Sequence, residues 1–324
     1  MKQNTAGAEK KSALKRLFEI REFGVICALI IMVLLLSVFA ESFFSASNFL
    51  TILRTVSTNG IIAVGVTFVI LTGGIDLSVG SGLALCGAFA AATFNGTGSS
   101  VLAAVVALVT GLILGLFNGV LIAFFDVPPF IQTLVTMTAA RGIVYIFCDG
   151  TPIPEVGAFI GGIGRGRVLG IPNPVILTVI VFAVGWFLLN KTTLGRYVYA
   201  IGGNEECTKL SGVNVRRYKM MPYIISGVTS ALACLILIGR LNSAQPSMGD
   251  KFEMDAIAAV VVGGTSLSGG SGTMVGTLVG ALIIGVLMNG MNMLGVDSYA
   301  QYIVKGAVIL FAVLLETRKN KNSK

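Results

Sequence analysis

The chain contains 324 residues, of which 55% are hydrophobic and 12% are charged, and its formal net charge is +8. Soluble domains carry about 25% charged residues, so this chain, with a mean hydropathy of +0.89, lacks the polar groups to cover a globular surface in water. Soluble folds are therefore excluded, and the absence of histidine excludes histidine chemistry. The composition predicts an all-α integral membrane protein.

Ten apolar runs are candidate membrane-spanning helices, which need about 20 largely apolar residues each. In chain order they are 24–44, 49–72, 79–94, 101–125, 130–148, 173–190, 221–240, 255–268, 273–294 and 299–316. Glycines interrupt the runs after Ala256, so eight crossings are the alternative if the short pieces do not span fully. We predict a polytopic helical bundle that forms one transmembrane domain over residues 24–316. The segment 149–172, rich in proline and glycine, is expected to form a structured lip or a half-helix on the outer surface.

Lysine and arginine are concentrated in the segments 2–21, 191–219 and 318–324. Short basic segments beside apolar spans mark the cytosolic side of a membrane. The pattern therefore predicts that both termini and the segment 191–220 are cytosolic, and that the number of crossings is even. Residues 1–23 and 317–324 are predicted to be basic tails. Because the positive charge flanks apolar spans, it indicates a lipid bilayer as partner and no nucleic acid.

An internal repeat is the most informative feature of the sequence. The segment 73–82, Gly-Gly-Ile-Asp-Leu-Ser-Val-Gly-Ser-Gly, recurs at 263–272 as Gly-Gly-Thr-Ser-Leu-Ser-Gly-Gly-Ser-Gly, with seven of ten positions identical. Corresponding glycine-interrupted segments in two halves of a membrane protein point to a transport pathway. Close packing of small residues is the alternative. We predict that the pathway is lined by Gly73, Gly74, Asp76 and Ser78 in the first copy and by Gly263, Gly264, Thr265 and Ser268 in the second.

These residues also carry a family resemblance. The run Val-Ile-Leu-Thr-Gly-Gly-Ile-Asp-Leu-Ser-Val-Gly-Ser at 69–81 resembles the signature of ribose-type permeases, which belong to a larger family that also holds branched-chain amino-acid permeases. Stretches within 133–153, 195–212 and 255–277 resemble the same family in the same order. The likeness covers roughly residues 45–315, which is nearly the whole chain.

The resemblance implies the permease subunit of an ATP-driven importer in a bacterial plasma (inner) membrane. An extracytoplasmic binding protein would deliver a simple sugar, and a separate ATP-binding subunit would hydrolyse ATP. The P-loop pattern GxxxxGK[ST] is absent from the chain, so ATP hydrolysis is expected on the separate subunit. With no histidine, no CxxC metal motif and no nucleophile–base pair in evidence, the chain is not expected to be an enzyme or to bind a cofactor or metal. A second permease copy, identical or related, would complete the pair. Ribose, xylose, galactose, inositol and a sugar-like autoinducer are all compatible with the sequence.

The cytosolic segment contains a short predicted helix. Asn204 can cap its N-terminus, acidic residues occupy its first turn, and Gly212 ends it. By resemblance this is the coupling helix that docks on the ATPase, and it includes Gly203, Asn204, Glu205, Ser211 and Gly212. A basic loop that only sets the topology is the alternative.

Three ionisable residues lie within apolar runs, where charge is costly and often functional. Asp76 is expected either to hydrogen-bond sugar hydroxyls or to cap the following helix. Arg141 is expected to contact an acidic group or a carbonyl for structural reasons, and Lys305 to extend toward a membrane interface. An ion-coupled secondary transporter of a small polar solute is the alternative function. Such a transporter would need ionisable coupling groups near the bilayer midplane, and the sequence offers few of them, namely Asp76 and Arg141.

Overall fold

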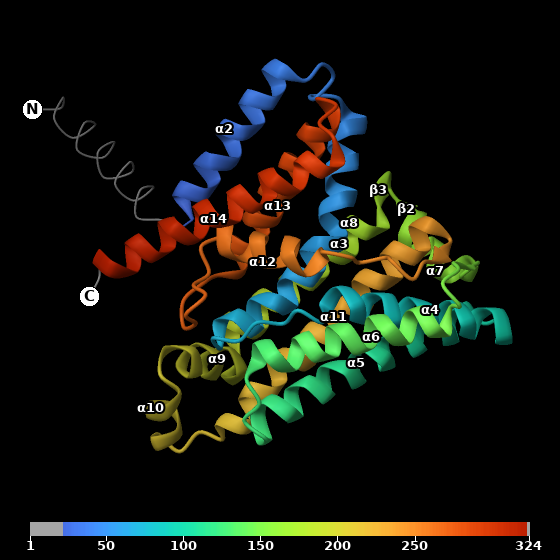
Figure 1. The fold of residues 1–324 in the computed structure, drawn as a ribbon. Coiled ribbons are helices and arrows are strands. Elements are labelled where there is room, and N and C mark those ends of the chain that lie inside the picture. The colour runs from blue at the N-terminus through green and yellow to red at the C-terminus, as the bar shows by residue number, and fades with distance from the viewer. Residues whose placement is uncertain (1–21, 323–324) are drawn as a thin grey trace, which may run out of the picture.

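The computed structural model describes residues 22–322, with side chains up to Leu314, and is built almost entirely of helices (Figure 1). The helices are α2 (Phe23–Phe39), α3 (Ala46–Leu71), α4 (Val79–Thr97), α5 (Ser100–Phe124), α6 (Pro129–Phe147), α7 (Gly157–Arg165), α8 (Asn173–Lys191), α9 (Thr193–Gly203), α10 (Glu205–Leu210), α11 (Val215–Leu241), α12 (Phe252–Val262), α13 (Met274–Met293) and α14 (Ser298–Asn322). The predicted tail 1–23 lies outside the described residues apart from its last two.

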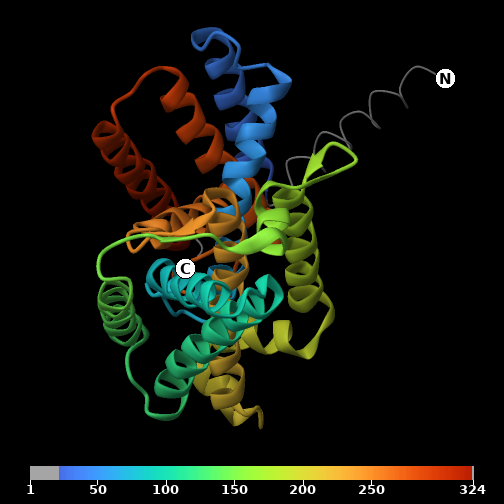
Figure 2. The same ribbon diagram turned by 90° about the vertical axis from the view of Figure 1, so that its right-hand side faces the viewer.

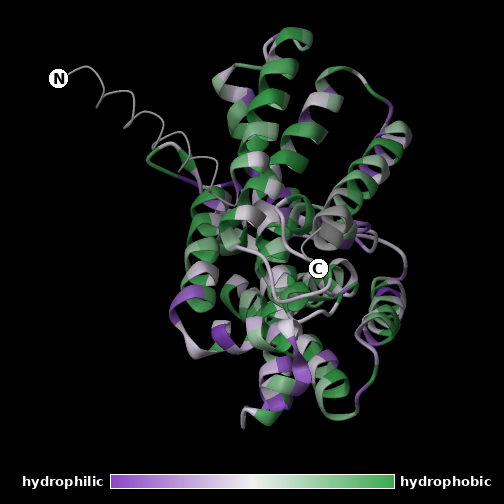
Figure 3. Cartoon of the chain, turned by 90° about the vertical axis from the view of Figure 1, so that its left-hand side faces the viewer, coloured by the Kyte–Doolittle hydropathy of each residue, from purple (hydrophilic) through white to green (hydrophobic). Residues whose placement is uncertain are grey.

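Seven of the described helices are long and apolar enough to cross a membrane, namely α3, α4, α5, α6, α8, α11 and α13. The helix α2 and the part Ser298–Leu314 of α14 are shorter apolar helices. Large apolar side chains are exposed along the helices, for example Ile146 at 83% and Val179 at 63%, and Figure 3 shows that hydrophobic residues make up much of the length of the helices. Such surfaces suit lipid and not water. The fold class is therefore confirmed as an all-α polytopic membrane protein.

One predicted span differs from expectation in its length. Within 255–268 the structure forms only α12, which has 11 residues and is about 16 Å long at 1.5 Å per residue. The hydrocarbon core of a bilayer is about 30 Å thick, so α12 alone cannot cross it. A glycine-rich stretch without helix follows from Gly263 to Thr273. Helix length therefore does not establish ten complete crossings.

The helices form two groups that α3 and α11 connect. The helices α4, α5 and α6 pack together and α11 packs against α4 and α5, whereas α2 and α12 pack on α13, and α14 packs on α12. The helix α3 contacts α11, α8, α12 and α13, so it runs from one group to the other, as Figures 1 and 2 show. Residues brought together by α3 and α11 therefore lie at the centre of the molecule.

Small residues allow α5 and α11 to cross closely. A Cβ atom on Gly227 of α11 would collide with the carbonyl oxygen of Gly111, and one on Gly115 of α5 would collide with the backbone of Tyr223 and Ile224. Without a hydrophobic driving force in lipid, helices associate through such close packing. These glycines therefore fix the distance between α5 and α11.

The proline-rich segment 149–172 contains the short helix α7 and the strands β1 (Ile153–Pro154), β2 (Arg167–Val168) and β3 (Ile171–Pro172). The strand β1 pairs antiparallel with β4 (Ser243–Ala244), and β2 pairs with β3. The prediction of a half-helix in this segment is confirmed. At the other end of the chain, α14 continues to Asn322, so most of the predicted tail 317–324 extends the last helix.

The close helix contact predicts opposite outcomes for two alanine substitutions. Gly227→Ala should lower the free energy of unfolding by about 1–3 kcal/mol, because overpacking forces the helices apart. Gly142→Ala in α6, where nothing lies within 4 Å of the added Cβ, should be neutral or stabilise by up to about 1 kcal/mol, because alanine favours helix. Thermal unfolding of both variants in detergent measures the difference. A wild-type melting temperature for Gly227→Ala would contradict the tight crossing.

Candidate functional site

The two repeated segments form non-helical breaks that lie side by side. The first break follows α3 at Leu71 and ends where α4 begins at Val79, and the second separates α12 from α13. The amide of Gly270 in the second break donates a hydrogen bond of 2.9 Å to the carbonyl oxygen of Leu71. A Cβ atom on Gly269 would also lie only 2.9 Å from the amide nitrogen of Gly73. The two segments that the sequence relates by repetition therefore pack together through their backbones.

The helix α9 packs against the end of α3 and against the second break. The hydroxyl of Tyr199 donates to the carbonyl oxygen of Gly272 over 2.8 Å. A Cβ atom on Gly202 would collide with the carbonyl oxygen of Leu71 and the amide of Gly270. Sequence reasoning missed α9, although Gly202 and Gly203 at its end were a visible signal. The structure thus joins the predicted cytosolic segment to the predicted pathway segments.

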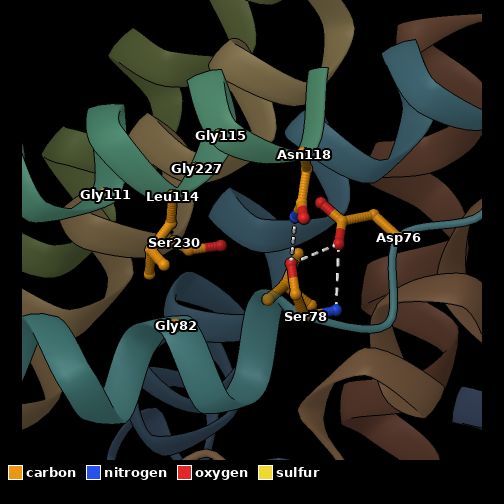
Figure 4. A pocket seen from close by; sticks show the side chains of 10 residues that line it. Asp76, Ser78, Gly82, Gly111, Leu114, Gly115, Asn118, Gly227 and Ser230 are labelled. Carbon is orange, nitrogen blue, oxygen red and sulfur yellow. Dashed lines mark hydrogen bonds between the residues drawn. The ribbon is translucent and has the colours of Figure 1, made fainter. Parts of the chain in front are cut away.

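Asp76 is the centre of a buried polar network in the first break (Figure 4). Its side chain is 2% exposed. Its Oδ1 accepts hydrogen bonds from the Ser78 amide at 2.9 Å and the Ser78 hydroxyl at 2.6 Å. Its Oδ2 accepts from the hydroxyl of Ser226 in α11 at 2.7 Å. The hydrogen bond from the Ser78 amide shapes the turn immediately before α4. This role of Asp76 resembles the helix cap that the sequence suggested.

The network extends through Asn118 of α5 to α6. The Asn118 amide donates to the Ser78 hydroxyl at 2.9 Å, and its carbonyl oxygen accepts from the hydroxyl of Thr136 at 2.6 Å and from the side-chain amide of Gln132 at 3.3 Å. The hydroxyl of Thr133 donates to the carbonyl oxygen of Ile75 over 3.0 Å. Helices α4, α5, α6 and α11 are thereby tied to one break. Asn118 and Ser226 were missed, although a polar residue in an apolar run was an available signal.

The space beside Asp76 is very small. The cavity that Asp76, Ser78, Asn118 and Ser230 help to line has a volume of about 10 Å³, close to the minimum of roughly 10–15 Å³ for one water molecule. A sugar ring does not fit there in this structure. The network therefore closes this part of the molecule to a solute.

The side chains of the second break make fewer hydrogen bonds than those of the first break. Thr265 is 0% exposed, and its hydroxyl has no hydrogen-bond partner among the described residues. Gly263 packs against the backbone of Gly276 in α13, whereas Gly264 and Ser268 are exposed. Gly264 has a φ of +87°, a conformation that favours glycine. Of the four predicted polar side chains, Asp76, Ser78 and Thr265 are buried within protein and Ser268 is not.

The remaining glycines of the first break also have local causes. Gly73 has a φ of +78°, which turns the chain directly after α3. A Cβ on Gly74 would collide with the hydroxyl of Tyr223 in α11. Close packing and a backbone break therefore coexist in this segment.

The short helix predicted after Asn204 is confirmed as α10. The side-chain oxygen of Asn204 accepts from the amide of Cys207 at 2.8 Å and caps its N-terminus. The Ser211 hydroxyl donates to the Cys207 carbonyl oxygen at 2.9 Å, and Gly212 follows with a φ of +81°. An ion pair of 2.9 Å joins Glu205 to Lys219 of α11. Gly203 is exposed at the end of α9, and nothing lies within 4 Å of a Cβ built on it.

The other ionisable residues of the apolar runs have structural partners. Arg141 donates to the carbonyl oxygens of Pro246 at 2.7 Å and Met248 at 2.9 Å, which confirms its expected contact with carbonyls. Lys305 forms an ion pair of 2.7 Å with Asp255 of α12. This pairing with a carboxylate of α12 is a partner that the sequence did not reveal. Among the described residues, no group of three His, Cys, Asp or Glu side chains is placed to hold a metal ion.

Comparison with known proteins identifies the family. Residues 48–313 match the family described as the permease component of the branched-chain amino acid transport system, and the chain belongs to this family. It is 53% identical to the ribose import permease protein of Bacillus subtilis over 93% of this chain and 94% of that protein. It is 52% identical to the ribose import permease protein of Haemophilus influenzae over 89% and 91% of the two chains. The L-arabinose transport system permease protein of Escherichia coli is 37% identical over 98% and 96%. No solved structure matches.

Two serines of α11 provide a matched test of the Asp76 network. Ser226→Ala removes a donor to the buried carboxylate and should lower the free energy of unfolding by about 1–3 kcal/mol. Ser230→Ala removes a hydroxyl that donates to the Ser226 carbonyl oxygen in its own helix, and should have a much smaller effect. Thermal unfolding in detergent compares the two. Equal effects would mean that Asp76 does not depend on Ser226.

Proposed function

We propose that this chain is the membrane permease of an ATP-driven importer for a simple sugar, with ribose or a closely related monosaccharide as solute. The observation that carries the proposal is that the chain is 53% and 52% identical in sequence to two ribose import permeases, over nearly the full length of the compared chains. The L-arabinose relative supports a monosaccharide. An ion-coupled carrier lacks a comparable observation, because Asp76 is held by hydrogen bonds beside a cavity of about 10 Å³.

The separate ATPase subunit is proposed to dock at α10. Beside this helix lies a groove of about 450 Å³ with both signs of charge, lined among others by Asp126, Glu205, Lys209, Arg216 and Lys219. Charged and exposed side chains suit a contact with a soluble subunit better than with lipid. Two ATP-binding subunits that close on each other each need such an element. A second permease copy and an extracytoplasmic binding protein complete the proposed assembly.

Transmission from the ATPase to the membrane is proposed to pass through α9. A movement of α10 shifts α9, and α9 has no free space against Leu71 and Gly270. Backbone atoms in contact transmit a displacement directly, because no side chain can rotate out of the way. The two breaks, including Gly73, Gly74, Asp76 and Ser78 in the first and Gly263, Gly264, Thr265 and Ser268 in the second, are proposed to line the path that opens.

The topology is proposed to have ten crossings with both termini and residues 191–220 in the cytosol of a bacterial inner membrane. In one of these crossings, the stretch 243–251 and α12 together span the bilayer. In support, the backbone of Gly249 packs against Gly80 in the first turn of α4, so closely that neither accommodates a Cβ. Non-helical backbone at membrane depth is tolerated where protein covers it.

Neighbouring glycines test the transmission. Gly202→Ala should reduce ATP-driven ribose uptake by roughly ten-fold or more, about 1.4 kcal/mol in the coupled step, while ATP hydrolysis by the assembled complex continues. Gly203→Ala places its methyl group in open space and should retain wild-type uptake. Uptake and hydrolysis are measured in proteoliposomes with the ATPase and binding protein. Normal uptake by Gly202→Ala would exclude α9 as the transmitting element.

Cysteine labelling tests the topology. Cys207 is exposed on α10 and should react with an impermeant maleimide only after the membrane is permeabilised. Gly162→Cys in α7, where a side chain meets open space, should react in intact cells, and a Cys207→Ser background separates the two signals. Labelling of Cys207 from outside intact cells would reverse the proposed orientation.

A further inference from the structure

The hairpin formed by β2 and β3 carries an exposed apolar tip. Leu169 in its turn is 97% exposed, and Val168 and Ile171 in the two strands are 53% and 49% exposed. Nothing lies within 4 Å of a Cβ built on Gly170, and Figure 2 shows the hairpin projecting away from the helices beside α8. The protein itself therefore leaves these apolar side chains largely uncovered.

The turn contains a residue that is unfavourable for its backbone conformation. Leu169 and Gly170 have φ values of +51° and +81°, and two-residue hairpin turns with positive φ at both positions strongly favour Asn, Asp and Gly. A bulky residue at positive φ is an outlier, and such strain persists mainly where function depends on it. Because Leu169 gains almost no packing within the protein, a partner outside the chain has to supply what the leucine contributes.

The position of the hairpin next to α8 places it within reach of the membrane surface. The helix α8 has 19 residues and is about 28 Å long, which matches a hydrocarbon core about 30 Å thick. Its exposed residues Val179 and Ile180 are apolar, as a lipid-facing surface requires. Leu169 precedes Asn173, where α8 begins, by four residues, so it lies within about 13 Å of that end of the helix. The tip can thus reach the lipid headgroups and the upper acyl chains.

The base of the hairpin is held firmly on α7. The backbone amide of Asn173 donates to the carbonyl oxygen of Gly166 at 3.0 Å, and the Asn173 side-chain amide donates to the carbonyl oxygen of Gly162 at 2.8 Å. The helix α7 in turn packs on α11, where a Cβ on Gly164 would collide with the backbone of Gly239. The hairpin is therefore a fixed projection, and a contact at its tip acts on α7 and α11.

Two arginines lie beside the apolar tip. Arg165 and Arg167 are exposed, and the sequence contains no Asp or Glu between Glu155 and Glu205. A guanidinium nitrogen of Arg165 donates to the side-chain oxygen of Asn242 at 3.3 Å, and within the described part of the chain neither arginine forms an ion pair. Apolar side chains next to basic ones are typical of interfacial membrane segments, and guanidinium groups bind phosphate well. The charge of the hairpin therefore complements phospholipid headgroups.

We propose that the β2–β3 hairpin is an interfacial membrane anchor. Leu169, with Val168 and Ile171, inserts into the phospholipid leaflet at the α7 end of the molecule, and Arg165 and Arg167 bind lipid phosphates. The anchor fixes the height of α7, and of the end of α11 on which α7 packs, relative to the bilayer. A soluble protein is the alternative occupant, and the apolar tip and the continuity with the lipid-facing side of α8 favour lipid. The anchor goes beyond the importer role and does not depend on the solute.

Tryptophan fluorescence of the purified permease in liposomes measures the insertion. The chain has one tryptophan, Trp186, so Leu169→Trp in a Trp186→Phe background reports from the tip alone. In liposomes of phosphatidylethanolamine and phosphatidylglycerol, bromine atoms on the upper acyl chains should reduce its emission at least about two-fold, because an interfacial segment enters that depth. Leu210→Trp in the same background is the matched control, because Leu210 is 87% exposed on α10, and its emission should stay unchanged. Unquenched emission from Leu169→Trp would overturn the anchor.

A reporter next to the tip tests the native leucine, since tryptophan itself favours membrane interfaces. Ile171→Trp in the Trp186→Phe background keeps Leu169 in place and should also be quenched by brominated lipid. Adding Leu169→Asn should reduce this quenching at least about two-fold, because the polar side chain no longer favours the acyl region. Asparagine accepts a positive φ, so the turn is retained. Adding Leu210→Asn instead should leave the quenching as it was. Equal quenching with leucine and asparagine at position 169 would contradict the insertion.

The same reporter separates a lipid contact from a protein contact. If brominated lipid quenches Leu169→Trp with or without the extracytoplasmic binding protein, the lipid assignment stands. If brominated lipid has no effect and the emission shifts only when the binding protein is added, the hairpin contacts that protein and the lipid assignment fails.

Discussion

The contact among Leu71, Gly202 and Gly270 is the constraint on which the rest of the structure depends. Here the end of α3, the end of α9 and the second break meet through backbone atoms, with a hydrogen bond of 2.9 Å between the Gly270 amide and the Leu71 carbonyl oxygen. Only glycine permits such an approach, because any Cβ would occupy the space of the neighbouring backbone. This junction sets the positions of α4 and α13, which begin directly after the breaks, and it connects the proposed ATPase contact to both repeated segments.

The Asp76 network determines how the helices around the first break are arranged. A buried carboxylate is tolerated because the hydrogen bonds from Ser78 and Ser226 satisfy it, and Asn118 links these groups to α6. A fully satisfied buried network specifies one arrangement, since a displaced member leaves an unpaired polar atom. A path through this region therefore requires several bonds to exchange together.

The two polar regions of the membrane domain differ in how much space they enclose. Around Asp76 the side chains bond to one another and leave about 10 Å³, whereas the cavity lined by α3, α11, α12, α13 and α14 measures about 350 Å³. The region around Asp76 accordingly suits a closed gate.

The sequence by itself determined the membrane class, the approximate positions of the seven long apolar helices, the helix at 205–210 and the repeat, because lipid forces backbone groups to pair within helices and local caps mark their ends. It also provided the family resemblance. Only the tertiary structure decided that α12 is half-length, that Lys305 pairs with Asp255, that Ser226 and Asn118 complete the Asp76 network, and that α9 joins the end of α3 to the second break. These features depend on which faces of distant helices meet. In a membrane helix the lipid-facing and protein-facing sides are both apolar, so the sequence shows little periodicity that would reveal the buried face.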